Sequence, residues 1–144
     1  MKKRLFSLLL FSVFLIGCLG HLYFRPRAVE EFPYRLTFFS KNVNNLLLHE
    51  VPKEGKTLTV AGAEAVVLRT FSTPATLSAR QRGETLHRPS SLSSDVTFTL
   101  KAYGHEHDGC FYLGTQLLSF GACVVLKGQN FALSACFTGA KAGF

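Results

Sequence analysis

The chain has 144 residues, a net charge of +7 and 47% hydrophobic residues. Once an N-terminal apolar segment is set aside, about 115 residues remain, which is enough for one domain with its own core and too few for two. The cations are spread along the chain and several of them flank the apolar segment. Nucleic-acid binding, which needs a clustered basic patch, is therefore not expected.

The N-terminal apolar segment covers residues 5–24 and contains no charged side chain. About twenty residues at 1.5 Å per residue span about 30 Å as a helix, which is the thickness of the hydrocarbon core of a bilayer. Three cations precede the segment, and Arg25 and Arg27 follow it, as expected for a single transmembrane helix. The sequence thus predicts a membrane anchor over residues 1–24.

A lipoprotein signal is a second interpretation of the same segment. Residues 15–18, Leu-Ile-Gly-Cys, resemble the lipobox of bacterial lipoproteins, and Cys18 is the candidate for lipidation. The apolar run continues past Cys18, whereas lipoproteins usually turn polar there, so both interpretations stay open. In either one the positive N-terminus stays in the cytoplasm. The rest of the chain is then expected on the extracytoplasmic face of a bacterial cytoplasmic membrane.

The residues after the anchor change in composition. Residues 25–33 are charged, contain prolines and predict a spacer, and residues 34–39 alternate like a first strand. Residues 46–51 predict one or two helical turns, and strands are expected over residues 57–60 and 65–71.

Residues 72–95 lose this apolar periodicity and are rich in Ser, Thr, Pro, Arg and Gly. We predict a long exposed loop or an irregular excursion between strands. Its cations Arg80, Arg82 and Arg88 are the candidate contacts for a partner.

The clearest strand covers residues 96–102, where apolar and polar side chains alternate. A turn-rich segment follows it, and residues 110–113 predict the return strand of a hairpin. Three more short apolar segments are separated by glycines, at residues 117–120, 122–127 and 131–137. The fold class predicted for residues 34–138 is all-β, a small sandwich or barrel of short antiparallel strands, with a tail over residues 139–144.

Four segments of the C-terminal part resemble a bacterial family known only as domain of unknown function 4330. They are Asp-Val-Thr-Phe-Thr-Leu-Lys-Ala at residues 95–102, Asp-Gly-Cys-Phe-Tyr-Leu-Gly at 108–114, Leu-Leu-Ser-Phe-Gly at 117–121 and Val-Val-Leu-Lys-Gly at 124–128. Members of that family carry one N-terminal membrane helix and a small β-rich domain. The resemblance covers the anchor position and residues 95–137, and it implies an anchor and a β fold without any activity, cofactor or site residue.

The one cluster of side chains that can bind metals lies between the two strands of this hairpin. His105 and His107 are two apart, so they point the same way in an extended segment, and Asp108 or Cys110 would complete a zinc or copper site. A polar hairpin turn has the same composition without any metal. Both interpretations stay open.

The exported part contains three cysteines, an odd number without a CxxC motif. Cys110, Cys123 and Cys136 lie among apolar residues, which predicts small buried side chains, although one pair can still oxidise.

No motif for nucleophilic catalysis, phosphate binding or dinucleotide binding occurs, so neither an enzyme nor a cofactor is expected. The sequence instead favours a membrane-anchored domain that contacts an envelope protein or polymer without catalysis. The alternative is a small metal-binding lipoprotein that uses His105, His107 and Cys110.

Overall fold

The computed structural model describes residues 12–19 and 29–143. In the β-domain, the elements in chain order are β1 (Phe32–Asn44), η1 (Leu47–His49), β2 (Thr57–Val60), β3 (Ala63–Gln81), β4 (Glu84–His107), β5 (Cys110–Leu113), β6 (Gln116–Leu118), β7 (Cys123–Lys127) and β8 (Ala132–Ala142). All strand pairings are antiparallel. The prediction of an all-β antiparallel fold is therefore confirmed.

Six of the strands close into a small barrel because β1 pairs on one side with β4 and on the other with β8. The order around the barrel is β1, β4, β3, β2, β7, β8 and back to β1. The seam between β2 and β7 is short, with two residue pairs in register. Strands β5 and β6 extend the end of β4 as a small flap.

Alternating side chains fill the barrel, as the period of two in the sequence requires. The predicted strand 96–102 is confirmed within β4, and its apolar residues all face the core. The largest fully buried side chains are Phe38, Phe98, Phe137, Leu36, Leu100, Leu113, Leu126, Val60, Val67 and Val96. The rings of Phe38 and Phe137 lie 5.5 Å apart between centroids. Because Phe38 of β1 and Phe137 of β8 are facing residues, this contact joins two neighbouring strands within the core.

Several boundaries differ from the sequence-based prediction. Strands β3 and β4 contain 19 and 24 residues and are not short. Most of residues 72–95, predicted as a long exposed loop or an irregular excursion between strands, belong to these two strands. Strand β8 continues to Ala142, so residues 139–142 belong to the barrel and not to a tail, because they pair with the start of β1.

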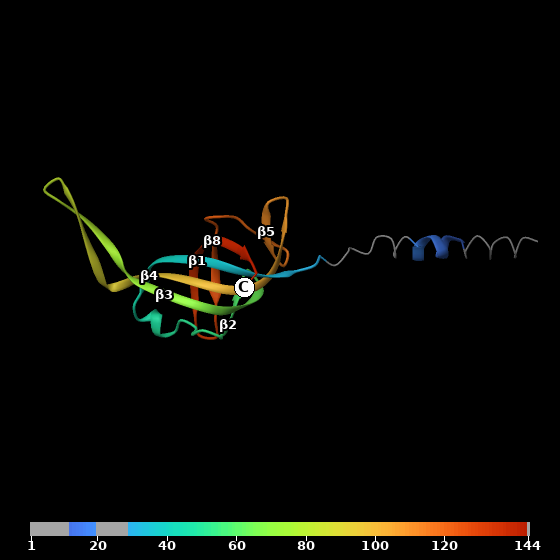
Figure 1. The fold of residues 1–144 in the computed structure, drawn as a ribbon, viewed down its shortest axis with the longest axis horizontal. Helices are drawn as coiled ribbons and strands as arrows, with labels where there is room; N and C mark the ends of the chain where they lie inside the picture. The colour runs from blue at the N-terminus through green and yellow to red at the C-terminus, as the bar shows by residue number, and fades with distance from the viewer. Residues whose placement is uncertain (1–11, 20–28, 144) are drawn as a thin grey trace, which may run out of the picture.

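The barrel has two distinct ends. Strand β1 begins at Phe32, opposite Gly104, and ends at Asn44, opposite Ser93. The chain therefore enters the barrel at one end, and β3 and β4 run out of it at the other. Figure 1 shows this hairpin of β3 and β4 projecting far from the barrel, on the side away from the start of β1 and from the β5 flap.

Residues 12–19 form an α-helix, and all of them are exposed. Among residues 12–19 and 29–143, no helix has the length and apolar character needed to cross a membrane. The remainder of the predicted anchor, residues 1–11 and 20–24, lies outside the described residues.

Candidate functional site

The most prominent surface feature is the outer part of the β3–β4 hairpin, residues 76–89, which we call the arm. Six residue pairs in register, from Thr76 with Pro89 to Gln81 with Glu84, give it a length of about 20 Å. The side chains of residues 76–80 and 82–89 are all exposed. Arg82 and Gly83 form the turn, and both have positive φ, as a two-residue hairpin turn requires.

The three predicted contact arginines all lie on the arm but do not form one patch. Arg80 pairs with Thr85, and Arg88 pairs with Leu77, three positions further from the tip. Because successive pairs of a hairpin point to opposite faces, Arg80 and Arg88 lie on different faces. Arg82 lies at the tip.

The two faces of the arm therefore differ in chemistry. One face carries Arg80 together with Ser78 and His87, and the Ser78 Oγ and His87 Nδ1 share a hydrogen bond of 2.9 Å. The other face carries Leu77 and Leu86, which are both exposed. The arm thus offers one polar, basic face and one partly apolar face.

Asn45 braces the base of the arm, in the segment between β1 and η1. Its backbone N–H donates to the Leu92 carbonyl oxygen at 3.0 Å, and its Nδ2 donates to the Ser91 carbonyl oxygen at 2.8 Å. Its Oδ1 accepts a hydrogen bond of 2.7 Å from the Ser94 hydroxyl. The sequence analysis did not identify this residue.

The predicted hairpin with its return strand at residues 110–113 is confirmed, but its turn is shorter than expected. Strand β4 continues to His107, and only Asp108 and Gly109 form the turn, both with positive φ. His107 lies opposite Cys110, and His105 lies opposite Tyr112, so all four side chains share one face. The His105 ring stacks on the Tyr112 ring with 5.2 Å between centroids, and its buried Nδ1 has no hydrogen-bond partner.

The second histidine, His107, contacts a carboxylate and not an aromatic ring. His107 Nε2 lies 3.3 Å from Asp108 Oδ2, and both side chains are largely exposed. In the described part of the chain, no three His, Cys, Asp or Glu side chains are placed to hold one metal ion.

Cys123 and Cys136 form a disulfide between facing positions of β7 and β8. The prediction that the cysteines of the exported part are buried is wrong, because Cys110 and Cys123 are exposed and Cys136 is half-buried. Cys110 and Cys18 are free thiols, and both are exposed. The sequence could have predicted this disulfide, because Cys123 and Cys136 lie equally far from the turn between β7 and β8.

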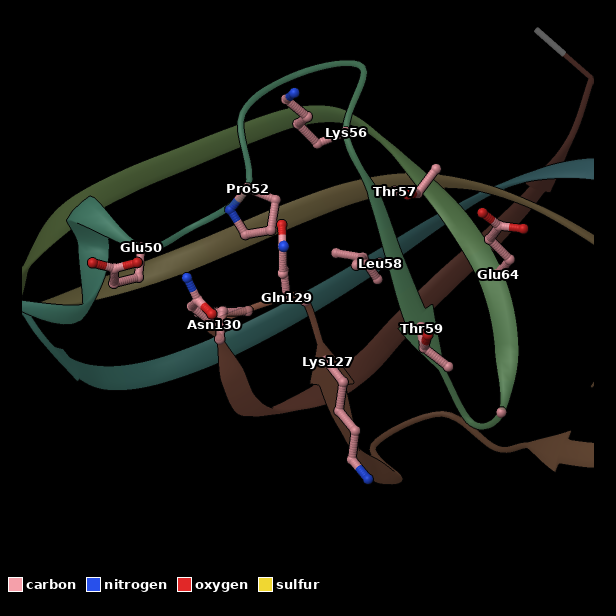
Figure 2. Close-up of a pocket in the computed structure, with 13 residues that line it drawn as sticks. Glu50, Pro52, Lys56, Thr57, Leu58, Thr59, Glu64, Lys127, Gln129 and Asn130 are labelled. Carbon is pink, nitrogen blue, oxygen red and sulfur yellow. The ribbon is translucent and has the colours of Figure 1, made fainter.

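A cavity of about 840 Å³ opens where β2 and β7 separate beyond their short seam. Figure 2 shows Leu58 pointing into it, Glu50 and Glu64 on opposite sides, and the amino groups of Lys56 and Lys127 pointing in different directions. Its charged groups therefore do not converge on one point, as the polar groups of a ligand site usually do.

Comparison of the chain with protein-family models, curated proteins and solved structures finds no match. The resemblance to domain of unknown function 4330 therefore stays a prediction. The arm, with its two faces and its braced base, is the candidate functional site.

Proposed function

We propose that the protein is a membrane-anchored, extracytoplasmic β-domain that acts without catalysis, by presenting the arm to another component of the cell envelope. The observation that carries this proposal is the exposure of residues 76–80 and 82–89 of the arm. A two-stranded hairpin without a hydrophobic face packed on a core is marginally stable in water. A partner that covers the arm supplies the missing burial.

The edges of the arm suit a partner strand. In the described chain, β4 pairs with β1 only as far as Ser93, and β3 pairs with β2 only as far as Val66. The outer N–H and C=O groups on both sides of the arm are thus available for strand addition. Pro74 and Pro89 lie at its base, so the outer five residues of each strand contain no proline.

Two observations support the proposed location. The disulfide between Cys123 and Cys136 is typical of proteins outside the reducing cytosol. The helical residues 12–19 expose Val13, Phe14 and Ile16 together with two leucines. A helix that is apolar all round is normally buried in protein or in lipid, which fits the proposed anchor.

Site-specific photo-crosslinking in living cells tests the role of the arm. A photoreactive amino acid in place of Arg82 is expected to give a discrete adduct, and the same probe in place of the exposed Glu54, on the turn before β2, is expected to give none. Ser78→Pro removes an N–H that, by hairpin geometry, points away from β4, and should abolish the adduct if the partner adds as a strand along β3.

The matched charge variant is Arg80→Glu with Arg88→Glu. It reverses the charge of one side chain on each face of the arm and leaves the tip unchanged. We expect the adduct to weaken in this variant, because a strand added along the edge of the arm has neighbouring side chains on both faces. Equal adducts from positions 82 and 54, or none from position 82, would contradict the proposed role of the arm.

A further inference from the structure

The β4 strand of the arm carries an acid, an apolar residue and a base at even spacing on one face. Glu84, Leu86 and Arg88 are two residues apart, and their register with β3 is unbroken, so they point the same way. All three are exposed. The order from the tip toward the base is therefore negative, apolar and positive.

Within one chain these two charges do not meet an opposite charge. Glu84 and Arg88 are four residues apart in an extended strand, which separates them by about 13 Å. The facing residues of β3 are uncharged, since Glu84 lies opposite Gln81 and Arg88 lies opposite Leu77. Among the residues that the structure describes, neither Glu84 nor Arg88 forms an ion pair. Both charges are thus available to a second molecule.

The free backbone edge of β4 is centred on the same residues. The two-residue turn of the arm is closed by a hydrogen-bonded pair. Backbone groups alternate along a strand, so the N–H and C=O of Leu86 point to β3, whereas those of Thr85 and His87 point to the outer edge. The next outward residue, Pro89, has no N–H. The outer edge therefore offers a short ladder with Leu86 at its centre.

Antiparallel pairing of this edge with the same edge of a second copy satisfies the charges and the backbone together. When Leu86 faces Leu86 of the second copy on a two-fold axis, Glu84 faces Arg88 of the second copy, and symmetry repeats this pair. Thr85 and His87 then form the hydrogen-bonded pairs. The apolar and charged pairs fall at the positions without hydrogen bonds, where facing side chains lie closest.

Other registers and the other edge of the arm lack this complementarity. Moving the centre by one residue, to Thr85, places Arg88 opposite Arg82 of the second copy, so like charges meet. In the arm, β3 carries Arg80 as its one charged residue, so two copies of its edge present no opposite charges. The charge pattern therefore selects the β4 edge for a second copy and leaves the β3 edge open.

We propose that two copies of the chain pair through the β4 edges of their arms and form one four-stranded sheet in the order β3, β4, β4, β3. Four strands with exposed leucines gathered at the centre are more stable than two isolated hairpins. The pairing goes beyond the proposed function, because it needs no other envelope component. The free β3 edges remain available for that component.

A bend at the base of the arm lets two anchored copies meet in this way. The register of β3 and β4 shifts between Pro74 and Thr76, and such a bulge bends a strand. Figure 1 shows the arm turning away from the long axis of the barrel there. Two arms can thus lie antiparallel while both chains enter their barrels from the membrane side. The interface is small, so its strength rests on the local concentration that the proposed anchor provides.

Disulfide trapping of the full chain in membranes tests the pairing. In a Cys18→Ala, Cys110→Ala background, Leu86→Cys places a thiol on the two-fold axis, where facing Cα atoms about 4.5 Å apart suit a disulfide. Mild oxidation should give a covalent dimer. Ala79→Cys is the matched control, because Ala79 faces Leu86 and is also exposed, but its two copies would lie three strand spacings apart, about 14 Å. It should give no dimer.

Charge reversal in the Leu86→Cys chain tests the register. Glu84→Arg and Arg88→Glu each place like charges at both facing pairs, so either change alone should lower dimer formation roughly tenfold. Both variants in one membrane, with tags of different size, should form a covalent heterodimer, because every facing pair then has opposite charges. This rescue requires both variants to be folded, so it separates loss of pairing from misfolding.

The outcomes distinguish the pairing from the proposed function. Equal cross-linking of Leu86→Cys and Ala79→Cys overturns the pairing, as does the absence of a dimer from Leu86→Cys. A mixture that cross-links no better than either charge variant alone overturns the register. If Leu86→Cys gives no dimer while position 82 still gives its adduct with another envelope component, the pairing falls and the proposed function stands. A dimer without that adduct supports the pairing and contradicts the proposed function.

Discussion

Gly104 is the residue at which the flap meets the barrel, and it leaves no space for a side chain. A Cβ atom built there would lie 2.5 Å from the Tyr112 carbonyl oxygen and 2.7 Å from the Phe111 ring. The close approach of β5 to β4 therefore depends on a residue without a side chain.

The first prediction is that Gly104→Ala lowers the free energy of unfolding by about 1–3 kcal/mol, because backbone or a buried ring must move. Gly139→Ala is the matched control, since a Cβ at that position meets nothing within 4 Å. Denaturant titration of both variants measures the difference. Equal stability of the two variants would contradict this account.

At the scale of elements, the arm depends on its brace at Asn45. Asn45→Ala removes two side-chain hydrogen bonds and leaves the largely buried Ser94 hydroxyl without its acceptor. Each such bond contributes about 1 kcal/mol, so we expect opening of the arm base to become easier by about 1–3 kcal/mol. Hydrogen exchange of residues 91–94 should accelerate accordingly.

Asn130→Ala, in the exposed turn between β7 and β8, serves as the control for this variant. It should leave exchange at residues 91–94 unchanged, and neither variant should alter exchange in the core strand 96–102. Unchanged protection of residues 91–94 in Asn45→Ala would show that the brace is unimportant.

The disulfide is the covalent link between β7 and β8, with 13 residues of sequence separation. Closing a loop of that size stabilises a folded protein by about 3 kcal/mol through the unfolded chain. Cys123→Ser with Cys136→Ser should lower the unfolding free energy by about that amount, whereas Cys110→Ser, at an exposed free thiol, should change it by less than about 0.5 kcal/mol.

Thiol titration of the unfolded, oxidised protein checks the same bond. It should find two free thiols, Cys18 and Cys110, when the N-terminus is intact and unmodified, and four after reduction. Four thiols before reduction would contradict the disulfide.

The elements that the sequence predicted are those with one buried face. Residues 96–102 and the return strand at 110–113 follow from alternation and turn residues, because burial imposes the alternation. The arm has no buried face, so its strands lacked that signal and resembled a loop. The arginines were found by composition, but their separation onto two faces depends on a register that is set by the turn at Arg82 and Gly83.

The closure of the sheet into a barrel also could not be predicted from the sequence. A sandwich and a barrel require the same alternation, and the choice depends on β1 pairing with both β4 and β8. Those contacts join residues far apart in the chain.

The last prediction concerns the two ends of the molecule, because the chain enters the barrel at one end and the arm projects from the other. The chain enters the barrel at Phe32, and the tip of the arm at Arg82 lies beyond the opposite end (Figure 1). If the positive N-terminus stays in the cytoplasm, the tip points away from the membrane on the extracytoplasmic side. In a Cys18→Ala, Cys110→Ala background, Arg82→Cys should react with a membrane-impermeant maleimide in cells whose cytoplasmic membrane is intact. Lys3→Cys should react only after that membrane is permeabilised, and the reverse pattern would place the domain in the cytoplasm.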